Sequence, residues 1–256
     1  MHRIPVLPDQ GKYEACLWFE SSLRLSSAGA ILRQLEYLAE GSKLLGLLGL
    51  ETILQAGDGE QALALLKDTA VDLLITDVLM PNLDGLSLLK KIRSGQSSAA
   101  ASLPCIVVSS LDDEATLATA LALDVNGFVQ KPFKAPILIK RLLIALSETV
   151  SESLDHLYSD VVIDVDRLQL GAHYQPKPAT HQAQHIPLER REKYTVVSLF
   201  QLRPDMQLAE DIKTKSGTVL LSAGFTLNQT RVHRMWELEG NLEKTSFRVL
   251  AGFSAG

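Results

Sequence analysis

The sequence has few cysteines and few aromatic residues. Its 256 residues include only Cys16 and Cys105, and aromatic residues make up 5% of the chain. The two cysteines lie far apart and in no metal-binding spacing, which excludes a disulfide framework and indicates a reducing compartment. A low aromatic content argues against a surface on which single-stranded nucleic acid stacks.

Long apolar runs are also missing. The densest apolar segment, residues 44–50, is much shorter than the roughly 20 residues that cross a bilayer. The first residues lack the apolar stretch of a signal peptide. We therefore expect a cytoplasmic protein with no membrane segment.

The chain has no excess of positive charge. Its net charge is -5, which gives no reason to expect a nucleic acid or an anionic membrane as partner. The hydrophobic content of 46% is ample for a packed core and excludes a wholly disordered chain. At roughly 150 residues per domain, the length allows one or two domains.

From about residue 50, short apolar runs alternate with helical patterns. We predict strands over residues 52–54, 71–76, 104–108 and 127–129, and helices over 60–67, 86–92, 112–123 and 135–148. This alternation predicts an α/β fold with a parallel sheet covered on both faces. Sites in such sheets lie beyond the carboxyl ends of the strands, where Asp77, Ser109 and Lys131 follow three different strands.

These three side chains together could act on a phosphoryl group. A lysine close to a carboxylate keeps it ionised and nucleophilic, and can neutralise charge on a transferred phosphoryl group. The Ser109 hydroxyl can donate a hydrogen bond to a phosphoryl oxygen. Each residue also has a structural interpretation: Asp77 as a cap, Ser109 as a loop hydroxyl and Lys131 in a surface ion pair.

Three segments resemble the receiver domain of bacterial two-component response regulators: LLITDVLMPNLDG, CIVVSS and NGFVQKPF. Ser109 follows Asp77 by 32 residues and Lys131 follows Ser109 by 22, separations typical of that family. The resemblance covers roughly residues 50–148. It implies a flavodoxin-like, doubly wound, five-stranded parallel sheet with strand order 2-1-3-4-5.

The resemblance also implies roles and partners. Asp77 would accept a phosphoryl group from a sensor histidine kinase or phosphotransfer protein, with Lys131 as the family's lysine, joined to Pro132 by a cis bond. Ser109 and Phe128 would form the switch that signals to an unidentified downstream protein. A homodimer would use the face of the fourth helix, fifth strand and fifth helix.

Receivers of this kind hold Mg²⁺ with two adjacent acids after their first strand, and two registers compete for that strand. A strand at residues 30–32 puts Arg33 and Gln34 at the acid positions, although this segment also has a helical apolar stripe. A strand at residues 16–19 is followed by Glu20, and is the register we favour.

The two registers differ in chemistry. In the favoured register, Glu20, Asp77 and the backbone carbonyl of Leu79 would provide oxygen ligands for Mg²⁺. In the other, the Arg33 cation would replace the charge of the metal. The chain would then fit a phosphorylation-independent receiver that acts as a docking scaffold.

We expect three regions: a receiver domain over residues 1–150, a linker over 151–192 and a small β-rich output or interaction module over 193–256. The alternation over 160–170 is compatible with a strand. In the module we predict strands over 194–197, 218–221 and 247–250, a hairpin turn at Ser216-Gly217, and a helix over 229–239 capped by Asn228 and ended by Gly240.

The module resembles an accessory segment of HD-type phosphohydrolase signalling proteins, through residues 202–206, 208–212 and 217–224. Asp205 stands where that pattern has glycine. Because the chain contains no His-Asp dipeptide, the HD metal site is absent and we expect no stand-alone enzyme. The receiver could still catalyse its own phosphorylation and dephosphorylation.

A divergent winged-helix output that binds DNA is an alternative, because residues 186–192 resemble the start of such a domain. From residue 186 the chain has ten Lys or Arg and eight Asp or Glu, which is hardly a basic patch, so we do not expect nucleic acid. His173, His181 and His185 lie in the linker, where solvated side chains are favoured over a zinc site.

Overall fold

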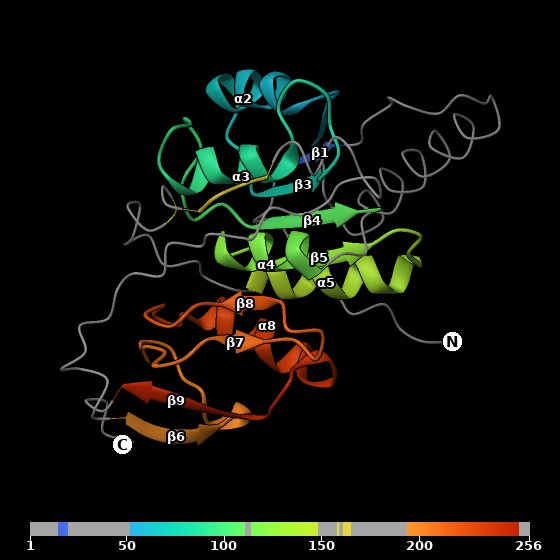
Figure 1. The fold of residues 1–256 in the computed structure, drawn as a ribbon. Coiled ribbons are helices and arrows are strands. Elements are labelled where there is room, and N and C mark those ends of the chain that lie inside the picture. The colour runs from blue at the N-terminus through green and yellow to red at the C-terminus, as the bar shows by residue number, and fades with distance from the viewer. Residues whose placement is uncertain are drawn as a thin grey trace. The chain divides into compact units, whose positions relative to one another are not determined.

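The computed structural model describes residues 15–19, 52–110, 114–147, 158, 161–164 and 194–250. These residues form two units (Figure 1). The first unit contains the described residues of Met1–Leu111 and Asn126–Ser147. The C-terminal unit contains those of Asp112–Val125 and Glu148–Gly256. The helix between the fourth and fifth strands thus belongs to the C-terminal unit.

The first unit is built on a parallel sheet. Its strands are β1 (Ala15–Phe19), β2 (Thr52–Ala56), β3 (Leu73–Asp77), β4 (Cys105–Ser109) and β5 (Gly127–Gln130), in the order β2-β1-β3-β4-β5. All neighbouring strands run parallel. The expected parallel sheet with interleaved helices is confirmed. β1 occupies the favoured register, while Glu20 and residues 30–34 lie outside the described residues.

The described residues of this unit form three helices: α2 (Gly59–Asp68), α3 (Gly85–Arg93) and α5 (Ala135–Ser147). Side chains alternate across a strand, so Leu73 and Ile75 of β3 face one side of the sheet. There they pack with Ile106, Val108 and Val129 and against Leu138, Leu142 and Ala145 of α5. Both α2 and α3 are near the positions expected from their apolar periodicity.

Short polar contacts define where these helices begin and how they are held. The Asp58 carboxylate accepts a hydrogen bond from Gln61 N at 2.9 Å, and the Asp84 carboxylate accepts one from Ser87 N at 2.8 Å. Each cap satisfies an amide that a first helical turn leaves without an intrahelical partner. At the end of α3, fully buried Arg93 donates to the carbonyl of Leu103 at 2.8 Å.

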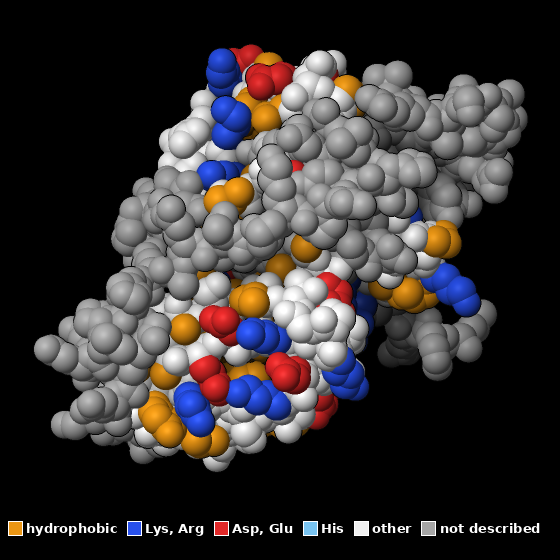
Figure 2. All heavy atoms as spheres, in the orientation of Figure 1, with side chains coloured by type: hydrophobic (Ala, Val, Ile, Leu, Met, Phe, Trp, Pro, Cys, Tyr) orange, Lys and Arg blue, Asp and Glu red, His pale blue; other side chains and the backbone are white. Residues whose placement is uncertain are grey.

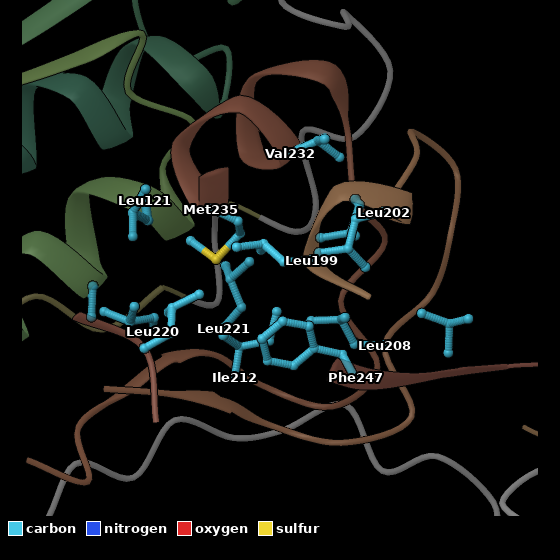
Figure 3. Close-up of a cluster of buried hydrophobic side chains, with 14 residues drawn as sticks. Leu121, Leu199, Leu202, Leu208, Ile212, Leu220, Leu221, Val232, Met235 and Phe247 are labelled. Atoms are coloured by element: carbon cyan, nitrogen blue, oxygen red, sulfur yellow. The ribbon is translucent and has the colours of Figure 1, made fainter. Parts of the chain in front are cut away.

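The C-terminal unit combines α4 (Glu114–Ala122) and α8 (Gln229–Glu237) with short antiparallel strands. β6 (Tyr194–Ser198) pairs with β9 (Ser246–Leu250), and β7 (Ile212–Lys213) pairs with β8 (Val219–Leu221). Its described residues also form two 3-10 turns, η3 (Leu199–Gln201) and η4 (Glu239–Asn241). Figure 3 shows its core, where Leu199, Leu208, Ile212, Leu221, Met235 and Phe247 meet.

Several expectations for this unit are confirmed and two are wrong. Asn228 caps α8 by accepting from Arg231 N, and Gly217, with φ of 90°, lies in the turn between β7 and β8. The helix ends at Glu237 rather than 239, because Leu238 N turns back to helix carbonyls and Gly240 lies in η4. Residues 161–164 form no strand, since alternation alone provides no pairing partner; residues 165–170 lie outside the described residues.

No helix among the described residues is long and apolar enough to span a bilayer.

Candidate functional site

Asp77 is the last residue of β3 and is 4% exposed. It lies opposite Val108 of β4, and the next residue, Val78, donates its amide to the Val108 carbonyl at 3.1 Å. The other four residues of β3 are apolar or small and buried, which fixes the strand in the sheet. The carboxylate therefore stands at the carboxyl edge of the parallel strands, as expected for a site in this class of sheet.

Lys131 lies beside Asp77. Its Nζ is 2.9 Å from Asp77 Oδ2, and the lysine side chain is 21% exposed. The Lys131 amide donates to the Ser109 carbonyl at 2.7 Å, which ties the residue after β5 to the end of β4. The bond to Pro132 is cis, as the resemblance implies. The ammonium places a positive charge directly beside the Asp77 carboxylate.

Ser109 and Phe128 lie on the neighbouring strands. Ser109 ends β4 and is fully buried, one residue beyond the partner of Asp77. Phe128 lies opposite Val107 in β5 and is partly exposed. The backbone thus brings the ends of β3, β4 and β5 together. The switch roles of these two residues stay predictions.

The loop after Asp77 folds back onto its carboxylate. Leu79 N donates to Asp77 Oδ1 at 3.1 Å, and Gly85 N donates to the Val78 carbonyl at 3.1 Å. A Cβ on Gly85 would lie 2.0 Å from the backbone oxygen of Asp77, which no real side chain tolerates. Glycine at position 85 is therefore required for α3 to begin this close to the strand end.

A hydrogen bond to the N-cap residue of α2 holds the same loop, and no sequence pattern predicted it. Asp58 Oδ2 accepts a hydrogen bond from Asn82 Nδ2 at 2.6 Å, and Asn82 has a φ of 59°. The Gln61 amide, followed by smaller effects that include Asn82, lowers the pKa of Asp58. The local signal was the Gly57-Asp58-Gly59 turn, but Asn82 lies 24 residues away and no local pattern indicates that contact.

The described residues do not form a complete Mg²⁺ site by themselves. Within them, no group of three or more His, Cys, Asp or Glu side chains is placed to hold a metal ion. Asp77 offers a carboxylate, but one of its oxygens lies against Lys131 and the other accepts from the Leu79 amide. Any further acid, such as Glu20, would have to come from outside the described residues.

Comparison with known proteins identifies similarities over this part of the chain. Residues 37–143 match the family model of the response regulator receiver domain. The chemotaxis protein CheY1 of Helicobacter pylori is 37% identical over 39% of this chain and 79% of its own length. The response regulator RR06 of Streptococcus pneumoniae is 27% identical over 62% of this chain and 67% of its own.

Solved structures are similar over a comparable part. The Francisella response regulator 1452 receiver domain is 27% identical with a TM-score of 0.39, covering 52% of this chain and 96% of that one.

Proposed function

Because this chain belongs to the receiver-domain family of response regulators, which act in phosphorelay signal transduction, we propose that Asp77 accepts a phosphoryl group. The donor is a sensor histidine kinase or a phosphotransfer protein. The observation that carries the proposal is the 2.9 Å contact between Lys131 Nζ and Asp77 Oδ2 at the edge of the sheet. A buried carboxylate in contact with a lysine ammonium suits a phosphoryl acceptor, because the cation neutralises charge on the transferred group.

The transfer is a displacement at phosphorus. An Asp77 carboxylate oxygen forms a bond to the phosphorus of a phosphohistidine, and the phosphorus–nitrogen bond breaks. The imidazole leaves with its electron pair and takes up a proton from water. Lys131 neutralises charge on the phosphoryl oxygens, so catalysis rests on positioning and electrostatics.

The switch follows from the new charge. Phosphorylation adds negative charge and strong acceptor oxygens at the end of β3. We propose that the Ser109 hydroxyl donates to one of these oxygens and that Phe128 changes its packing in response. In this proposal Asp77 is the reacting group, and its two polar neighbours are Ser109 and Lys131. The switch consists of Ser109 and Phe128.

Receiver domains generally bind Mg²⁺ at the phosphorylation site. We propose that Glu20 joins Asp77 and the Leu79 carbonyl as ligands, and that the ion, when bound, neutralises the charge of the transferred group. The backbone of β1 supports this assignment, because its last residue, Phe19, directly precedes Glu20.

The wider organisation is also part of the proposal. The receiver, with its five strands, occupies residues 1–150. A linker covers 151–192, and a small mainly-β module, similar to the HD-type accessory segment, covers 193–256. The protein works in the cytoplasm and signals to another protein. The share of a relative's own length that this chain covers differs, from 36% for CpxR of Klebsiella pneumoniae to 79% for CheY1.

A DNA-binding output has less support. On the face of the C-terminal unit in Figure 2, basic and acidic side chains alternate, and there is no unbroken basic area. In α8, two of its basic residues, Arg231 and Arg234, are buried. A recognition helix needs basic side chains at its surface.

Phosphorylation is tested with acetyl phosphate and Mg²⁺ on the full chain. We expect intact-mass spectrometry to show the addition of one phosphoryl group to the wild type and none to Asp77→Asn. Asp68→Asn is the matched control, because Asp68 is an exposed acid at the end of α2. If the wild type gains no mass while a known receiver does, the chain is the phosphorylation-independent docking scaffold instead.

A further inference from the structure

One helix of the receiver sequence is packed into the C-terminal unit. α4 lies in the chain between β4 and β5, yet its Ala118 and Leu121 belong to the same buried cluster as Leu220 and Met235. Leu121 is 2% exposed. Figure 3 shows it on the green ribbon of α4, directed towards the side chains from α8 and β8. The C-terminal unit therefore includes α4 in its core.

The first turn of α4 is fastened by hydroxyl groups from the β7–β8 turn. Glu114 Oε2 accepts a hydrogen bond from Thr214 Oγ1 at 2.5 Å and another from Ser216 Oγ. These two hydroxyls, Ser216 first, lower the pKa of Glu114 below its usual value. Thr214 is itself buried and receives the Thr218 amide on its hydroxyl at 3.1 Å, so the acceptor site is built by the turn.

The other end of α4 is fastened by a buried ion pair. Arg231 Nε of α8 lies 2.9 Å from Asp124 Oδ1, and the two side chains are 2% and 1% exposed. Tyr158 donates its hydroxyl to Asp124 Oδ2 at 2.6 Å. The same arginine donates through Nη2 to the carbonyl of Ala122, the last residue of α4, at 3.4 Å.

The chemistry of these contacts makes them specific. A buried charge is costly unless it is paired and hydrogen-bonded, so Asp124 and Arg231 each depend on the other. Arginine suits this place because its guanidinium forms the ion pair with Asp124 and also donates hydrogen bonds to two carbonyls, that of Ala122 and, at 2.7 Å, that of Thr226. Apolar packing alone would not fix the position of α4 along its axis.

We propose that the C-terminal unit is the intramolecular partner of α4 and receives the signal of the receiver through this helix. α4 follows Ser109 of β4 by five residues and is followed by β5, so the chain passes from the first unit into the C-terminal unit and back. A change at the ends of β4 and β5 therefore reaches the core around Leu121 through covalent connections. The signalling part of this inference rests on the proposed phosphorylation of Asp77.

This assignment changes the expected dimer interface. A homodimer built on the apolar side of α4 would compete for Ala118 and Leu121, which the C-terminal core already buries. The partner of α4 is thus a segment of the same chain rather than a second copy.

The packing of α4 is tested without any phosphodonor, by hydrogen exchange of the full chain. Arg231→Met removes the cation paired with buried Asp124, and Arg203→Met, at an exposed position, is the matched control. We expect amides of residues 114–125 to exchange about tenfold faster or more in Arg231→Met, with β3 unchanged. Unchanged exchange in 114–125 would overturn the proposal.

A milder pair of variants keeps the test decisive if Arg231→Met does not fold. Thr214→Val removes one hydroxyl from Glu114 but keeps the shape of the side chain, and Thr195→Val, on exposed β6, is its control. We expect faster exchange in the first turn of α4 for Thr214→Val only. Equal exchange in both variants would contradict the attachment of α4 to the β7–β8 turn.

Signal transfer is tested with acetyl phosphate and Mg²⁺. We expect phosphorylation to alter exchange in residues 208–235 of the wild type, and to leave it unaltered in Asp77→Asn and in Arg231→Met. A phosphorylated wild type with unaltered exchange there would overturn the signalling route. A wild type that gains no phosphoryl mass would instead contradict the proposed function, while the first exchange experiment still decides whether α4 is held.

Discussion

At the scale of single residues, the site depends on one pair of opposite charges. Asp77 is almost buried, and an ionised carboxylate in that position needs compensation from a nearby cation or hydrogen bonds. Lys131 provides the charge and the Leu79 amide provides a hydrogen bond, each to a different carboxylate oxygen. These two contacts therefore hold the carboxylate in one orientation.

Replacement of Lys131 tests how much that charge contributes. For Lys131→Met we expect phosphorylation by acetyl phosphate to slow by about 10- to 100-fold, since a group that neutralises transition-state charge is lost. Lys134→Met removes an exposed lysine three residues later and should leave the rate unchanged. The rate is followed by intact mass over time, and equal rates in both variants would exclude an electrostatic role for Lys131.

At the scale of secondary structure, three helices begin where a side chain accepts a hydrogen bond from a backbone amide of the first turn. Asp58, Asp84 and Asn228 each accept a hydrogen bond from the amide three residues later, and so begin α2, α3 and α8. The first turn of α4 is different, because Glu114 points its carboxylate to hydroxyls of the β7–β8 turn. That element is fixed by tertiary contacts as well as by its own sequence.

The Glu114 contact predicts a pH dependence. Its pKa is lowered in the folded chain, so the ionised form stabilises the fold above the ordinary value of about 4.3, and this contribution disappears as pH falls through the folded value. Urea unfolding should show the wild type more stable than Glu114→Gln at pH 7. The difference should shrink below about pH 4. A constant difference across this range would mean that charge is not involved.

At the scale of the whole chain, the two units do not follow the order of the sequence. The C-terminal unit takes α4 from between two strands of the first unit, so neither unit is one continuous segment. The expectation of a receiver over residues 1–150 follows the family pattern, whereas packing assigns α4 to the other core. The C-terminal core therefore depends on α4, a helix that the sequence pattern attributes to the receiver domain.

A core substitution in α4 tests this dependence. We expect Leu121→Ala to destabilise the C-terminal unit by about 2–5 kcal/mol, because it removes buried methyl groups and leaves a cavity. Ile137→Ala, at a half-exposed position of α5, should cost about 0.5 kcal/mol or less. Urea unfolding followed by Trp236 fluorescence in a Trp18→Phe background reports on this unit. No loss of stability in Leu121→Ala would place α4 outside its core.

The sequence by itself determined the elements of the sheet and the candidate site. Period-two and helical patterns are local, and they located β3, β4 and β5 and the helices between them. Because parallel strands end at one edge, the order of the strands along the chain was enough to assign Asp77, Ser109 and Lys131 to one place. Asp77 and Lys131 are in contact there, and Ser109 lies on the neighbouring strand end.

Only the tertiary structure decided which distant residues brace that framework. The contact from Asn82 to Asp58 joins residues 24 positions apart, and that from Thr214 to Glu114 joins residues 100 positions apart. Asp124 and Arg231 are also far apart in the sequence. None of these residues has a local pattern that indicates its partner, since a carboxylate next to a helix has the same local sequence whether solvent or a buried arginine faces it. A charged side chain needs a partner when it is buried, and which side chains are buried is decided only when the chain folds.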